Sequence, residues 1–262
     1  MTRLTTLADA EAVAKRAALE IARRLEGARR ARGVAHLALS GGSTPARTYE
    51  LLARECSDWE GIEVWFADER CVGPEDEQSN YRLARETLLA LAGVPDERVH
   101  RMEGELGPEE GAERYARALR ERIAPEDDNP DTSPPAGGEA GASGPATPAL
   151  DAVVLGIGPD GHVASLFPGA PALDDADPQT LCVGVHDAPK PPPERITLSL
   201  AVLRAARGCV LLAMGAAKAD AVAAMLTAPS RHVPASLLRR GRLSVIVDDA
   251  AAPPPPLGMS TS

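Results

Sequence analysis

Short apolar runs of strand length recur along the chain and are separated by longer stretches with mixed polarity. These runs cover residues 34–40, 62–68, 150–158, 181–187, 194–200, 208–214 and 243–249. Several of the intervening stretches repeat apolar residues every three or four positions, which is the period of an amphipathic helix. Strands that alternate with helices predict an α/β fold with a mostly parallel sheet flanked by helices on both faces.

The predicted helices have recognisable starts and apolar faces. The N-terminal stretch predicts an amphipathic helix with Val13, Ala17, Ile21 and Leu25 on one side. Ser79 is placed to cap a later helix, because its hydroxyl can accept a backbone N–H of the first turn. The stretches expected to be helical are the segment from Pro45, then 80–93, 108–124 and 215–227.

Two segments depart from this alternation. Residues 125–149 contain six prolines and four glycines with no apolar periodicity, which predicts a flexible surface insertion. The tail from about residue 251 is also proline-rich and is expected to be loose. Because strands on both sides of the insertion can belong to one sheet, we expect residues 1–262 to form a single α/β domain.

Charge and composition exclude some classes of function. The formal net charge of −10 argues against non-specific binding to nucleic acid, although a local group of lysines and arginines can still bind a small anion. No apolar run approaches the ~20 residues of a membrane span, and the N-terminus lacks the apolar region of a signal peptide. Four scattered cysteines fit reduced thiols. We therefore expect a cytoplasmic protein.

A glycine-rich loop follows the strand at 34–40. Its backbone N–H groups, its hydroxyls and the N-terminus of the next helix could together hold a phosphate. The loop lacks the lysine of a nucleotide P-loop, and an ordinary capped turn explains it equally well. The candidate residues are Gly41, Gly42, Ser43 and Thr44.

Charged residues follow several other predicted strands. Asp68 and Arg70 come at the end of the run at 62–68, where ligands bind in open parallel sheets. Lys190, Arg195 and Lys218 lie at further junctions between elements. Each could be an ordinary surface charge, but together they suggest a pocket for an anion.

The loop "GIGPDGHVASLFPG" at 156–169 allows two interpretations. Its G-x-G-x-x-G spacing, which ends at Gly161, is that of a dinucleotide-binding loop. Prolines at 159, 168 and 171 oppose the continuous helix that a dinucleotide needs. A stiff loop that presents His162 as a base beside the Asp160 carboxylate is the favoured hypothesis.

Taken together, these motifs resemble the 6-phosphogluconolactonase family. The resemblance rests on "SGGSTP", "ADER" with a downstream "SN", "GIGPDGHVASLFP", "PKPPPERITL" and "GAAK", in that order over about residues 36–220. It implies a modified doubly wound fold without metal or cofactor. It also implies hydrolysis of 6-phospho-D-glucono-1,5-lactone to 6-phosphogluconate, the second step of the oxidative pentose phosphate pathway.

The resemblance also implies roles for individual residues. His162 would be the general base and Asp160 would orient it or the water. Gly42, Ser43 and Thr44 would hold the phosphate with Arg70 and Lys190, while Gly161, Arg195 and Lys218 are further candidates for substrate binding. A small phosphorylated sugar lactone would be the partner, with no nucleic acid and no membrane.

Two other functions stay open at this stage. One is a sugar-phosphate isomerase or deaminase of the glucosamine-6-phosphate deaminase type, with Asp68 as the base. That relative typically has Asp-Glu-Tyr at the position of Asp68-Glu69-Arg70, and Asn-Glu-Pro after its histidine, which favours the lactonase. The other is a non-catalytic sensor that keeps the pocket without the chemistry.

Overall fold

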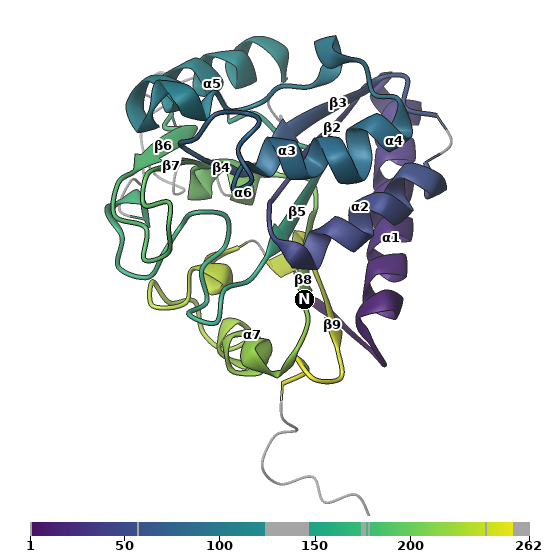
Figure 1. Ribbon diagram of the computed structural model, residues 1–262. Helices are drawn as coiled ribbons and strands as arrows, with labels where there is room; N and C mark the ends of the chain where they lie inside the picture. Colours follow the sequence, from purple (N-terminus) through teal and green to yellow (C-terminus); the bar gives the residue numbers. More distant parts are fainter. Residues whose placement is uncertain are drawn as a thin grey trace, which may run out of the picture.

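The computed structural model describes residues 2–56, 58–123, 147–173, 177, 179–238 and 240–253. The main sheet contains six parallel strands (Figure 1), and the prediction of a mostly parallel sheet is confirmed. Their order across the sheet is β1 (Arg3–Leu7), β9 (Leu243–Asp248), β8 (Cys209–Ala213), β5 (Ala152–Gly156), β2 (Ala35–Leu39) and β3 (Ile62–Phe66). Every residue of β2 and β8 is buried, as expected for central strands of a parallel sheet.

Helices connect these strands and pack on them. The predicted apolar face of α1 (Ala10–Arg32) is confirmed, since Val13, Ala17, Ile21 and Leu25 are fully buried. The other α-helices are α2 (Ser43–Glu55), α3 (Asn80–Ala84), α4 (Ala90–Ala92), α5 (Pro108–Arg122), α6 (Leu200–Ala205) and α7 (Ala219–Met225). A π-helical segment, Arg85–Leu89, joins α3 to α4, so the predicted helix at 80–93 is one helical stretch with Ser79 as its cap.

Two predicted strands do not join the main sheet. A second, antiparallel sheet contains β4 (Asp68–Arg70), β7 (Arg195–Leu198) and β6 (Cys182–Val185), in that order. The connection between β6 and β7 is too short for the crossover of about a dozen residues that parallel neighbours require. The run at 62–68 therefore divides, with β3 ending at Phe66 and Asp68 beginning a strand of the second sheet.

Both chain termini and the insertion differ in part from expectation. The chain begins with strand β1, rich in threonine, and α1 starts only after its cap Asp9. The predicted insertion lies mostly in 124–146, outside the described residues, but Thr147 and Ala149 at its end are buried. In the predicted loose tail, Ala251 is fully buried and donates its N–H to Asp248.

The strand order creates a crevice between β2 and β5. From β2 the chain continues to β3 on one side, whereas from β5 it continues to β8 on the other. Connections that leave two adjacent strands in opposite directions open a crevice at their carboxyl ends, where ligands bind in open α/β sheets. The glycine-rich loop follows β2 and the histidine loop follows β5 at this point. Within the described residues, no helix is both long and apolar enough to span a membrane.

Candidate active site

A cleft of about 390 Å³ lies at the carboxyl ends of β2, β5 and β8. It collects predicted site residues from five separate parts of the chain. The predicted residues that line it are Gly41, Gly42, Ser43, Thr44, Asp68, Arg70, His162, Lys190, Arg195 and Lys218. Asp160 contacts His162 from outside the cleft, and Gly161 supports the same loop without lining the cleft.

His162 and Asp160 form a hydrogen-bonded pair. The Nδ1 atom of His162 lies 2.5 Å from Oδ1 of Asp160. An ionised carboxylate can only accept hydrogen bonds, so Nδ1 carries the proton and Nε2 keeps a free lone pair. The imidazole is 17% exposed and lines the cleft, so a molecule bound in the cleft can contact it.

The pKa values of the pair favour a neutral imidazole beside a charged carboxylate. Burial lowers the pKa of His162 below its ordinary value, and this outweighs the opposing effect of Asp160. Burial raises the pKa of Asp160, but the charge and hydrogen bond of His162 bring it below the ordinary value. At neutral pH the pair therefore holds one imidazole base oriented by one carboxylate.

The loop that carries His162 is shaped by turns instead of a helix. Gly158 accepts the N–H of Gly161, and Gly161 has a φ of 82° in the left-handed region. A side chain at Gly161 would meet Val233, since a Cβ there would lie 2.8 Å from Cγ1 of that residue. Among the described residues the next α-helix after β5 is α6, so the loop lacks the helix that a dinucleotide requires.

The Phe167 ring contacts both His162 and Arg195. It lies 4.5 Å from the His162 ring between centroids, and the Arg195 guanidinium lies 5.5 Å from the Phe167 centroid. Arg195 also donates hydrogen bonds to the backbone carbonyls of Lys190 and Pro192. This arrangement fixes the segment that carries Lys190 against the histidine loop.

Four cationic side chains line the cleft, and their charges affect one another in two pairs. Burial lowers the pKa of Arg195, and the charge of Arg70 lowers it further. Burial likewise lowers the pKa of Lys218, with Lys190 as the next contribution. Like charges held together at the wall of a cleft favour a bound anion, and guanidinium and ammonium groups are the usual ligands of phosphate. The N-terminus of α2, at Ser43, adds its helix dipole to the same cleft.

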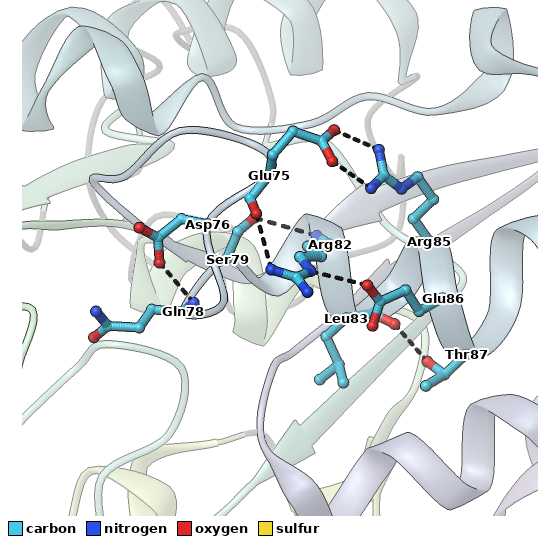
Figure 2. A network of polar contacts seen from close by, with 9 residues as sticks. All are labelled: Glu75, Asp76, Gln78, Ser79, Arg82, Leu83, Arg85, Glu86 and Thr87. Carbon is cyan, nitrogen blue, oxygen red and sulfur yellow. Dashed lines mark hydrogen bonds and ion pairs between the residues drawn. The ribbon is translucent and has the colours of Figure 1, made fainter.

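The loop between β4 and α3 positions Arg70. Figure 2 shows how this loop is fastened to the helix that follows it: Glu75 pairs with Arg85 through both carboxylate oxygens and its carbonyl accepts from Arg82, while Asp76 accepts the N–H of Gln78. The carbonyl of Gln78 accepts a hydrogen bond of 2.6 Å from the Arg70 guanidinium. The network thus holds the guanidinium at the cleft, and its Nε is buried with no partner among the described residues.

Glu69 has a structural position beside this arginine. Its carboxylate accepts the N–H groups of Arg70, Asn80 and Tyr81 and the hydroxyl of Ser79. Burial raises the pKa of this carboxyl, and the hydrogen bonds oppose that rise. Glu69 therefore closes the N-terminus of α3 and ties it to β4.

Two residues that sequence reasoning did not single out hold Asp68. Oδ2 of Asp68 accepts the Ser165 hydroxyl at 2.8 Å, and Oδ1 accepts the Asn80 amide at 3.2 Å. Asn80 also packs on the glycine-rich loop, because a Cβ on Gly41 would lie 1.7 Å from its Oδ1. The quoted motifs "SN" and "GIGPDGHVASLFP" contained the signal, since both place a buried polar side chain beside the "ADER" strand.

The described residues give no metal centre. No three His, Cys, Asp or Glu side chains converge as ligands anywhere in the part of the chain that the structure describes.

Comparisons with known proteins agree with this geometry. Residues 8–247 match the model of the family described as glucosamine-6-phosphate isomerases/6-phosphogluconolactonase. The chain belongs to this family. The predicted resemblance and the predicted α/β fold are thus both confirmed.

Individual family members are similar over nearly the whole chain. A Streptomyces coelicolor protein named 6-phosphogluconolactonase is 35% identical over 93% of this chain and 91% of its own length. A rat protein of the same name is 36% identical over 84% of this chain and 80% of its own length. The crystal structure of a 6-phosphogluconolactonase from Shewanella baltica superimposes with a TM-score of 0.78 at 30% identity, covering 95% of this chain and 98% of that one.

Proposed function

We propose that this protein hydrolyses 6-phospho-D-glucono-1,5-lactone to 6-phosphogluconate, the second step of the oxidative pentose phosphate pathway. The observation that carries the proposal is a neutral imidazole, oriented by Asp160, in a cleft with four cations. The family and the names of its similar members support the same substrate.

In the first step, His162 acts as the general base. Its Nε2 takes a proton from a water molecule as the water oxygen bonds to the lactone carbonyl carbon. The carbonyl electron pair moves onto oxygen and gives a tetrahedral oxyanion. Asp160 stabilises the imidazolium that forms and keeps its ring in place.

In the second step, the same histidine acts as the general acid. The oxyanion re-forms the carbonyl, the bond from that carbon to the ring oxygen breaks, and the imidazolium gives its proton to the leaving oxygen. The products are a carboxylic acid, which ionises, and a free hydroxyl on the opened chain. The histidine ends neutral, so no other reactant is consumed.

The cations supply binding and orientation. Arg70, Lys190, Arg195 and Lys218, with the loop at Gly42, Ser43 and Thr44, hold the phosphate of the substrate. A fixed phosphate places the lactone carbonyl at His162, and such positioning contributes to the rate by removing rotational freedom.

A deaminase reaction needs a carboxylate base, for which Asp68 is the candidate in the cleft. Both carboxylate oxygens of Asp68 accept hydrogen bonds, from Ser165 and Asn80, which suits a structural carboxylate better than a free base. The lactonase is therefore the favoured member of the family's two activities.

An assay with freshly generated lactone tests the proposal. We expect consumption of the lactone well above its spontaneous hydrolysis, and no release of ammonia from glucosamine 6-phosphate. Ammonia release without lactone consumption would contradict the proposal and indicate the deaminase activity instead.

A further inference from the structure

Ser40 lines the cleft at the carboxyl end of β2. It follows the last residue of β2, whose neighbours are β5 on one side and β3 on the other. The loop after β5 carries His162, and the chain after β3 carries Asp68 and Arg70. Ser40 lines the cleft between these two groups.

The backbone of Ser40 is held, but its hydroxyl is not. The phenol of Tyr49 accepts the N–H of Ser40 at 3.0 Å and donates to its carbonyl at 2.7 Å. The residue is 5% exposed, and its Oγ has no hydrogen-bond partner among the described residues. A buried hydroxyl without a partner is unfavourable in a folded protein, so its presence at the wall of a cleft points to a ligand.

The hydrogen-bonding chemistry of the Ser40 hydroxyl differs from that of the four cations of the cleft. The four cations can only donate hydrogen bonds, and they suit an anionic phosphate. A neutral hydroxyl both donates and accepts, which suits a sugar hydroxyl. We propose that the Ser40 hydroxyl is a specificity contact that exchanges a hydrogen bond with a hydroxyl of the sugar portion of the ligand. The inference rests on the proposed function for the identity of that sugar acid.

The test compares two ligands on one variant. The probes are 6-phosphogluconate, which carries both phosphate and sugar hydroxyls, and inorganic phosphate, which carries no sugar. For Ser40→Ala we expect the dissociation constant of 6-phosphogluconate to rise about tenfold, the loss of one hydrogen bond, while that of phosphate stays unchanged. The kcat/KM for the lactone should fall by a similar factor.

Thr48 offers a matched control. Its hydroxyl is also fully buried and without a partner among the described residues, but it lies in α2 and does not line the cleft. Thr48→Val should leave both dissociation constants and kcat/KM at the wild-type values. Neither substitution removes a hydrogen bond of the free protein, so both variants should melt at or above the wild-type temperature.

Each other outcome overturns the inference. Unchanged affinity of Ser40→Ala for 6-phosphogluconate would mean that the hydroxyl contacts no ligand, and equal weakening of both probes would assign Ser40 to the phosphate. Failure of the proposed function is recognised separately, because it would appear as wild-type protein that does not hydrolyse the lactone. The difference between the two probes does not depend on turnover.

Discussion

Asp160 fixes which nitrogen of His162 keeps a free lone pair. Its carboxylate accepts a hydrogen bond from the protonated Nδ1 at 2.5 Å, so the lone pair lies on Nε2. The imidazole lines the cleft. A substitution that removes the charge but keeps the shape should disturb this assignment, since an amide can present its NH₂ to Nδ1 and move the proton to Nε2. We predict that Asp160→Asn lowers kcat about 100-fold or more with little change in KM. Steady-state kinetics provide the test, and a fall in kcat/KM caused by KM alone would contradict the orienting role.

The same pair predicts the pH dependence of the reaction. The proposed role of His162 as general base requires a neutral imidazole, so we expect the rate to fall as pH falls through the pKa of this imidazole. Because that pKa lies below its ordinary 6.5, the acid limb of kcat/KM should lie below pH 6.5, with a plateau across neutral pH. The measurement is a pH–rate profile corrected for spontaneous lactone hydrolysis. An acid limb centred above pH 7 would contradict this environment.

Gly158 leaves the space that the pair occupies. A Cβ at this position would lie 2.0 Å from Nδ1 of His162 and 2.2 Å from Oδ1 of Asp160. We predict that Gly158→Ala displaces the pair and lowers kcat at least tenfold, while 6-phosphogluconate still binds through the cations. Gly73→Ala is the matched control, since a Cβ there meets nothing within 4 Å. Equal kcat for the two variants would show that the close packing has no effect on turnover.

Arg70 should act through the phosphate. Its guanidinium is held at the cleft by the Gln78 carbonyl, beside Arg195. Arg70→Ala should raise KM for the phosphorylated lactone roughly 10- to 100-fold, the range for a lost charge-assisted hydrogen bond. The weak hydrolysis of unphosphorylated glucono-1,5-lactone should be unchanged.

Arg117→Ala serves as the control for this substitution, because Arg117 is an exposed residue paired with Glu113 on α5. It should leave KM unaltered. If Arg70→Ala weakened the hydrolysis of both lactones equally, Arg70 would not contact the phosphate.

His36 makes the fold sensitive to acid. Its Nδ1 accepts the indole N–H of Trp65, which requires a neutral ring, and burial lowers its pKa with Asp151 opposing. Below pH 6.5, the ordinary pKa of histidine, His36 therefore binds a proton more readily in the unfolded chain than in the folded protein. The free energy of unfolding should fall as pH drops below that value, by up to ~1.4 kcal/mol per pH unit for this residue.

Urea unfolding between pH 7 and 5 measures this contribution. His36→Asn keeps an acceptor near Trp65 without a titrating ring, so its pH slope should be shallower than that of the wild type. His232→Asn is the control, since His232 is exposed. Identical slopes for wild type and His36→Asn would contradict the prediction.

The main sheet could be predicted because its strands are continuous apolar runs, as β2 and β8 show. The second sheet could not be separated from it, because Asp68–Arg70 and Arg195–Leu198 are short and pair across more than a hundred residues. Strand β1 was not predicted because its two threonines and its exposed Leu4 do not form the continuous apolar run of a buried strand.

The cleft was largely predictable because its charged residues and glycines follow strands whose carboxyl ends meet. The supports of the cleft were harder to foresee. Ser165 and Asn80 lie within quoted motifs, but their contacts with Asp68 are visible only once the fold brings the three residues together. Gly161 was predicted as a site residue, but it does not line the cleft. Its left-handed conformation instead shapes a turn next to Val233.

The most direct test of the account is the turnover of His162→Ala on freshly generated 6-phospho-D-glucono-1,5-lactone, followed by a coupled assay and corrected for spontaneous hydrolysis. We predict that kcat falls at least 100-fold while the dissociation constant of 6-phosphogluconate changes less than about threefold, because a general base acts mainly in the transition state. Turnover equal to that of the wild type would contradict the central role of this histidine.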